Sequence, residues 1–110
     1  MAPDAVQLTR ELLKFNTINP PGAERACAQH LGGLLERAGF RVDYAEFAPT
    51  RMSLVAKIGG GKAKPPLGFT GHIDTVPLGT AAWKADAFGA SMEGGKLYGR
   101  GSSDMKSGVA

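Results

Sequence analysis

The sequence predicts a layered α/β fold, because two amphipathic helical segments precede several short apolar segments of strand length. The 110 residues suffice for one small domain or for part of a larger one. Hydrophobic residues make up 43% of the chain and charged residues 21%, which is typical of a globular protein. The 16 glycines and 7 prolines gather between the apolar runs, so they predict turns rather than disorder.

Two helices are expected from local signals at their ends. Asp4 can cap a helix whose apolar residues, up to Phe15, recur in steps of three and four. The second helix is expected over about residues 23–38, with Gly39 as the left-handed residue that ends it. The adjacent glycines at positions 32 and 33 would allow this helix to contact a sheet closely.

Four shorter segments have the apolar patterns of strands. Residues 40–44 alternate between apolar and polar, as in a half-buried strand, and residues 53–58 predict a second strand. Residues 67–72 form a short apolar run typical of a buried strand, and residues 96–99 predict one more short strand. A helical pattern begins at the last residues, so we expect the functional protein to continue beyond Ala110.

The composition argues against several classes of function. The net charge is +3, but the lysines and arginines are scattered, which disfavours a nucleic-acid-binding face. The single cysteine, Cys27, lies on the apolar stripe of the second helix and predicts a buried thiol in a reducing compartment. No signal peptide and no apolar run of bilayer length is visible, so a cytoplasmic protein without a membrane partner is expected.

The first candidate for chemistry is the pair His72 and Asp74. Residues two apart in an extended chain project to the same side, so the carboxylate can fix the tautomer of the imidazole. An imidazole held in this way is a good zinc ligand, and the pair follows a predicted buried strand, where α/β proteins bind ligands. The alternative is a histidine on the surface beside a solvated aspartate.

The second candidate is Asp104, within a segment rich in glycine and serine at residues 98–108. A carboxylate in such a loop can bridge two metal ions through its two oxygens. The alternative is a flexible turn in which Asp104 caps the last helix, with Arg100 and Lys106 simply solvated. A nucleotide-binding function is a further alternative, but residues 56–63 fail the phosphate-loop pattern at two positions.

Residues 69–79 (FTGHIDTVPLG), Trp83 and residues 97–108 (LYGRGSSDMKSG) together resemble one family of di-zinc metallopeptidases. This family includes acetylornithine deacetylase, succinyl-diaminopimelate desuccinylase, aminoacylase and the glutamate carboxypeptidases such as carboxypeptidase G. The resemblance covers nearly the whole chain, with Ala87 as a departure where the family often has proline. It implies a three-layer α/β/α zinc-exopeptidase-like catalytic domain. Residues 1–110 would be its N-terminal part, without the lid domain.

The resemblance also implies roles for individual residues. His72 is expected to ligate one zinc ion, and the Asp104 carboxylate to bridge two zinc ions. Asp74 is expected to be the catalytic acidic residue that orients His72. The peptide bond between Asp104 and Met105 is expected to be cis. Co²⁺ or Mn²⁺ are expected substitutes for Zn²⁺. The general base and the remaining metal ligands are expected beyond Ala110.

The implied function is hydrolysis of the amide bond of an N-acyl amino acid or small peptide through a metal-bridging water. This is a deacetylase, desuccinylase or carboxypeptidase activity in amino-acid metabolism, and the full-length protein is expected to form a homodimer. The alternative is a non-catalytic homologue or an inactive fragment with a binding or scaffold role. The isolated chain is expected to bind zinc weakly and to turn over no substrate.

Overall fold

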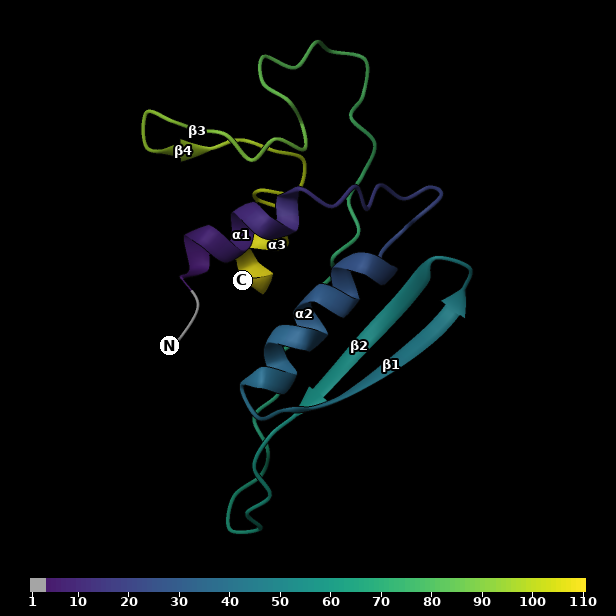
Figure 1. The fold of residues 1–110 in the computed structure, drawn as a ribbon, viewed down its shortest axis with the longest axis vertical. Coiled ribbons are helices and arrows are strands. Elements are labelled where there is room, and N and C mark those ends of the chain that lie inside the picture. The colour runs from purple at the N-terminus through teal and green to yellow at the C-terminus, as the bar shows by residue number, and fades with distance from the viewer. Residues whose placement is uncertain (1–3) are drawn as a thin grey trace.

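The computed structural model describes residues 4–110, in which helices and two small antiparallel sheets are arranged as Figure 1 shows. This mixture agrees with the predicted α/β class. The elements in chain order are α1 (Ala5–Leu13), α2 (Arg25–Arg37), β1 (Arg41–Ala48), β2 (Arg51–Lys57), β3 (Met92–Glu93), β4 (Lys96–Leu97) and α3 (Lys106–Val109).

The two long helices begin and end near the predicted residues. The Asp4 side chain accepts a hydrogen bond from the Val6 amide at 2.9 Å and so caps α1. Helix α2 begins slightly later than expected and ends before Gly39, whose φ of 95° is the left-handed conformation that suits glycine. The Phe40 amide then donates to the Leu35 carbonyl and turns the chain into β1.

The hydrophobic core joins the facing sides of α1 and α2. Leu8 and Leu12 of α1 and Cys27 and Leu31 of α2 form one buried cluster. Cys27 is fully buried, as its place on the apolar stripe predicted. The C-terminal helix α3 packs against α1, and its Val109 contacts the same cluster.

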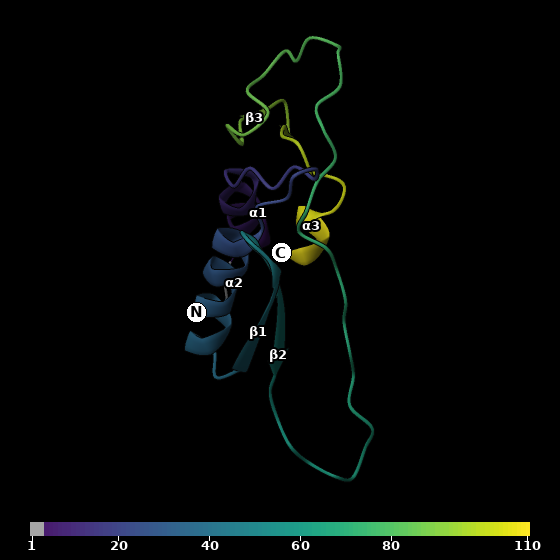
Figure 2. The same ribbon diagram turned by 90° about the vertical axis from the view of Figure 1, so that its right-hand side faces the viewer.

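The hairpin of β1 and β2 forms a sheet whose one face is covered by α2, as Figures 1 and 2 show. Gly32 permits this contact, because a Cβ atom at that position would overlap the Tyr44 side chain. The two strands lie where the sequence predicted them. The expected half-burial of β1 is seen at Val42 but not at Tyr44, which is 40% exposed.

The predicted buried strand over residues 67–72 is not present. Leu67 is 82% exposed and Phe69 is 92% exposed, and the chain there runs as the long unpaired segment seen in Figure 2. An extended segment becomes a strand only when its backbone N–H and C=O groups pair with a neighbour. Among the described residues, β1 pairs with β2 and β3 with β4, and this segment adds to neither sheet.

Strand β4 lies within the short strand predicted over residues 96–99, and β3 pairs with it across a two-residue turn. Gly94 and Gly95 form that turn with φ values of 59° and 75°, which glycine adopts without strain. The last helix begins near the position that the sequence predicted. None of the helices in residues 4–110 has the length and apolar character needed to cross a membrane.

Candidate metal centre

The segment that carries His72 and Asp74 is clamped to the loop after α1. The Thr17 hydroxyl donates to the Ile73 carbonyl at 2.6 Å, and the Thr75 amide donates to the Thr17 carbonyl at 3.0 Å. Thr17 is fully buried and Thr75 is 4% exposed. The backbone is therefore fixed on both sides of Asp74, although no strand is formed there.

His72 uses both ring nitrogens. Nδ1 lies 3.0 Å from Asp74 Oδ1 and 3.0 Å from the Asp74 carbonyl oxygen, while Nε2 lies 2.9 Å from Asp104 Oδ1. The bond to the Asp74 carbonyl, with the two carboxylates, raises the pKa of His72 because these acceptors stabilise the imidazolium. The structure thus brings together the three predicted site residues, from two segments about thirty residues apart.

Asp74 lies between His72 and Asn19. The Asn19 side-chain amide donates from Nδ2 to Asp74 Oδ2 at 3.1 Å, which leaves Oδ1 for His72. The Asn19 hydrogen bond is the main cause that lowers the pKa of Asp74, and the contact with His72 adds to it. Asp74 therefore stays ionised and favours a proton on His72 Nδ1.

Asp104 projects from the loop before α3, and its side chain is 79% exposed. Its peptide bond to Met105 is cis, as the resemblance implied. The alternative in which Asp104 caps the last helix is wrong, because α3 has Met105 at its N-cap position and no side-chain cap. The Asp104 carboxylate instead faces His72.

Lys106 is buried, so the alternative in which it is simply solvated is wrong. It is 1% exposed, and its Nζ donates to the Phe15 carbonyl at 2.9 Å. Burial lowers the pKa of this lysine. The contact ties the loop that carries Asp104 to the chain just after α1, close to the Thr17 contacts that hold the His72 segment.

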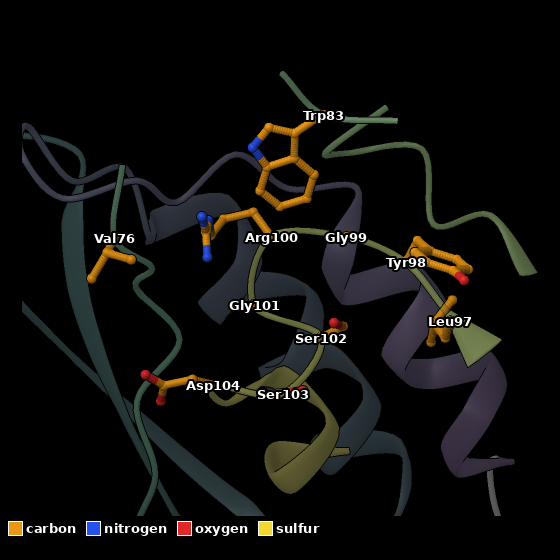
Figure 3. Close-up of a pocket in the computed structure, with 10 residues that line it drawn as sticks. All are labelled: Val76, Trp83, Leu97, Tyr98, Gly99, Arg100, Gly101, Ser102, Ser103 and Asp104. Atoms are coloured by element: carbon orange, nitrogen blue, oxygen red, sulfur yellow. The ribbon is translucent and has the colours of Figure 1, made fainter. Parts of the chain in front are cut away.

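A cavity of about 320 Å³ opens beside Asp104, and Trp83 and Arg100 form part of its wall (Figure 3). The Arg100 guanidinium lies 4.9 Å from the centroid of the Trp83 ring, so Arg100 is stacked rather than simply solvated. The Trp83 Nε1 donates to the Leu78 carbonyl at 3.2 Å. Trp83 therefore packs within its loop and also forms part of the cavity wall.

A second, smaller cavity of about 130 Å³ adjoins the first, because Val76 and Asp104 line both. Its wall contains the polar side chains of the site: Asn19, His72, Asp74 and Asp104. Within residues 4–110, no group of three or more His, Cys, Asp or Glu side chains is arranged to hold a metal ion. The His72–Asp104 pair therefore fits a part of a metal site, since imidazole and carboxylate are both zinc donors.

Sequence reasoning missed Asn19 and Lys106. Asn19 lies in a proline-rich turn and contacts Asp74, 55 residues further along the chain, while Lys106 contacts Phe15 across 91 residues. No spacing rule connects residues so far apart. The only local signal was the polar side chain of Asn19 inside a turn that also stops α1.

The residues of the candidate site lie in a part of the chain that is similar to a known protein family. Residues 68–110, which contain His72, Asp74 and Asp104, match the family model described as peptidase family M20/M25/M40. The part of the chain that carries the candidate site is thus similar to this peptidase family. The family resemblance that the two motifs indicated is therefore confirmed.

Relatives of this M20-type chain are similar over almost all of its length. It is 42% identical over 110 residues to the succinyl-diaminopimelate desuccinylase of Gluconobacter oxydans (strain 621H), covering 97% of the chain and 28% of that protein. It is 39% identical over 108 residues to the enzyme of that name from Wolbachia pipientis subsp. Culex pipiens (strain wPip), covering 97% of the chain and 26% of the relative. The chain thus spans little more than a quarter of the length of the curated relatives it matches.

Proposed function

We propose that the chain forms the N-terminal part of the three-layer α/β/α catalytic domain of an M20-type amidohydrolase that depends on zinc. The observation that carries this proposal is the His72 ring, which contacts Asp74 through Nδ1 and Asp104 through Nε2. The family match over the same residues supports it. The whole protein would hydrolyse the amide bond of an N-acyl amino acid or small peptide.

The donor atoms of the chain fit a share of a two-zinc site. Asp104 Oδ1 lies 2.9 Å from His72 Nε2. His72 Nε2 and Asp104 would together hold one zinc ion, because an imidazole nitrogen and a carboxylate oxygen are both zinc donors. The second Asp104 oxygen would remain for a second ion. Further ligands would have to come from other residues, because these two donors do not complete a shell.

Each chain residue has a distinct task in this proposal. Bound zinc would supply Lewis acidity, which activates water near neutral pH and polarises an amide carbonyl. Asp74 would hold the proton on His72 Nδ1 and so keep the Nε2 lone pair directed at the metal. The Trp83 side of the larger cavity would pack against the apolar part of the substrate.

The names of the relatives suggest the substrate to test first. Both are called succinyl-diaminopimelate desuccinylases, so we propose a succinylated amino acid as the leading candidate and acetylated amino acids as the next. Dimer formation, a cytoplasmic location and the absence of a nucleic-acid partner remain predictions from the sequence and the family.

The test uses the protein that contains this chain, with its zinc content and its release of succinate from N-succinyl-diaminopimelate as readouts. We expect His72→Ala to weaken zinc binding by more than about 100-fold, beyond the loss typical of an outer-shell partner, and to abolish hydrolysis. His30→Gln is the matched control, because His30 contacts Glu11 and lines neither cavity. Normal hydrolysis by His72→Ala would end the proposal.

The alternative from the sequence is a non-catalytic homologue or an inactive fragment with a binding or scaffold role. The two proposals differ in the behaviour of the parent protein. If it binds no zinc and cleaves no acylated amino acid, while His72→Ala folds and behaves as the parent does, the scaffold role is the better account. The isolated 110-residue chain is expected to show no turnover under either proposal.

A further inference from the structure

We propose that Asn19 is a positioning residue for the candidate metal centre. Its side-chain amide would fix the orientation of Asp74, which in turn would hold the His72 ring toward Asp104. The inference rests on the proposed function, because it takes His72 as a metal ligand. It assigns a task to a loop that the sequence marked only as the end of a helix.

The two Asp74 carboxylate oxygens have different hydrogen-bond partners. Oδ2 accepts a hydrogen bond from Asn19 Nδ2 at 3.1 Å, and Oδ1 lies 3.0 Å from His72 Nδ1. A carboxylate is planar, so fixing one oxygen sets the direction of the other. Among residues 4–110, these are the two side chains that hydrogen-bond the Asp74 carboxylate. Loss of the Asn19 amide would leave His72 as the one side chain among these residues that holds the carboxylate, so its orientation would be less restricted.

The loop that carries Asn19 is held by backbone contacts with the segment that carries Asp74. The Asn19 backbone amide donates to the Thr75 carbonyl at 2.8 Å, and Ile18 forms an isolated parallel bridge with Thr75. Asn19 therefore contacts the Asp74 segment through its backbone and through its side chain. A substitution at position 19 removes the side-chain contact and leaves the backbone contact available.

Asn19 lies in the wall of the candidate metal centre. Asn19 lines the cavity of about 130 Å³ together with His72, Asp74 and Asp104. The Asp74 side chain is 33% exposed, so access of water to its carboxylate is restricted and water is a poor substitute for the Asn19 amide. Outer partners of metal ligands orient those ligands, and their loss typically reduces metal affinity about 10–100-fold.

The experiment is a double-mutant cycle on zinc affinity, measured by competition with a chelating dye in the protein that contains this chain. Asn19→Ala is expected to weaken zinc binding about tenfold, the low end of the range for outer partners. Asn16→Ala is the matched control, because Asn16 lies in the same loop and its side chain accepts a hydrogen bond from the Ile18 amide rather than contacting Asp74. If Asn19 acts through Asp74, adding Asn19→Ala to Asp74→Ala causes no further loss.

Two further measurements separate positioning from a general loss of structure. The melting temperature of Asn19→Ala should equal that of Asn16→Ala, and kcat should fall about tenfold with KM unchanged. Asn19→Ser, whose hydroxyl is too short to reach Asp74, should behave as Asn19→Ala does and serves if that variant fails to fold.

The possible failures are distinguishable. Unchanged zinc affinity in Asn19→Ala, or losses that add in the double variant, would overturn the role of Asn19 alone. Absence of zinc binding and hydrolysis in the parent protein would overturn the proposed function, and this inference with it.

Discussion

Single side chains show how much of this site depends on contacts that are distant in sequence. The spacing of His72 and Asp74 already placed both side chains on one side of an extended segment, and the observed contact at 3.0 Å follows from it. Asp104 was a candidate from its loop, and only the resemblance linked it to His72. The Asn19 and Lys106 contacts span 55 and 91 residues, and no spacing rule connects residues so far apart.

Cys27 offers a residue-scale prediction. It is fully buried, and burial raises its pKa, so the reactive thiolate is scarce near neutral pH. We expect iodoacetamide to label Cys27 at least about 100-fold more slowly in the native protein than in denaturant, because opening of a core costs about 3 kcal/mol or more. Mass spectrometry of timed samples measures both rates. Equal rates would show that the α1–α2 core is open.

The elements divide into those with local signals and those that need a partner. Asp4 and Gly39 are signals within the chain itself, and helices α1 and α2 lie close to the predicted ranges because helix hydrogen bonds are local. Residues 67–72 have the apolar pattern of a strand but are paired with none of the described strands. An apolar pattern in one segment does not determine whether a second strand pairs with it.

The contact between α2 and the β1–β2 sheet leads to a prediction at this scale. Gly32→Ala should lower the free energy of unfolding by about 1–3 kcal/mol, because the new methyl group overlaps the Tyr44 ring. Gly33→Ala is the matched control, since its nearest neighbour is the flexible end of Arg37 at 3.4 Å. It should raise stability by up to about 1 kcal/mol through helix propensity. Chemical denaturation of each variant gives the comparison.

A second background tests the cause. In a Tyr44→Ala protein the overlap is removed, so Gly32→Ala should no longer destabilise and should approach the effect of Gly33→Ala. If Gly32→Ala still destabilises in that background, the close approach of α2 to Tyr44 is not the reason for glycine at this position.

The molecule as a whole is extended for its length. Its radius of gyration is 15.3 Å, whereas a compact domain of about 100 residues has a value near 13 Å. The unpaired segment after β2, which Figure 2 shows along one side, extends away from the helices. Leu67 and Phe69 are its most exposed large apolar residues. Surfaces of this kind usually pack against other protein.

The isolated chain should therefore self-associate. We expect light scattering to show oligomers at micromolar concentration, and the double variant Leu67→Ser with Phe69→Ser to remain monomeric to higher concentration. Lys62→Ser with Lys64→Ser is a control in the same segment, where loss of charge should not reduce association. A monomeric parent chain would contradict the prediction.

The hydrogen bonds that hold the candidate site differ in how well they tolerate substitution of the residues that form them. Lys106, Thr17 and Asn19 each donate a hydrogen bond from the side chain. The acceptors of the bonds from Lys106 Nζ and from the Thr17 hydroxyl are the backbone carbonyls of Phe15 and Ile73. Every amino acid carries such a carbonyl. Mutational drift at positions 15 and 73 can thus alter packing while leaving these anchor points in place. A single change at a donor position removes an anchor outright.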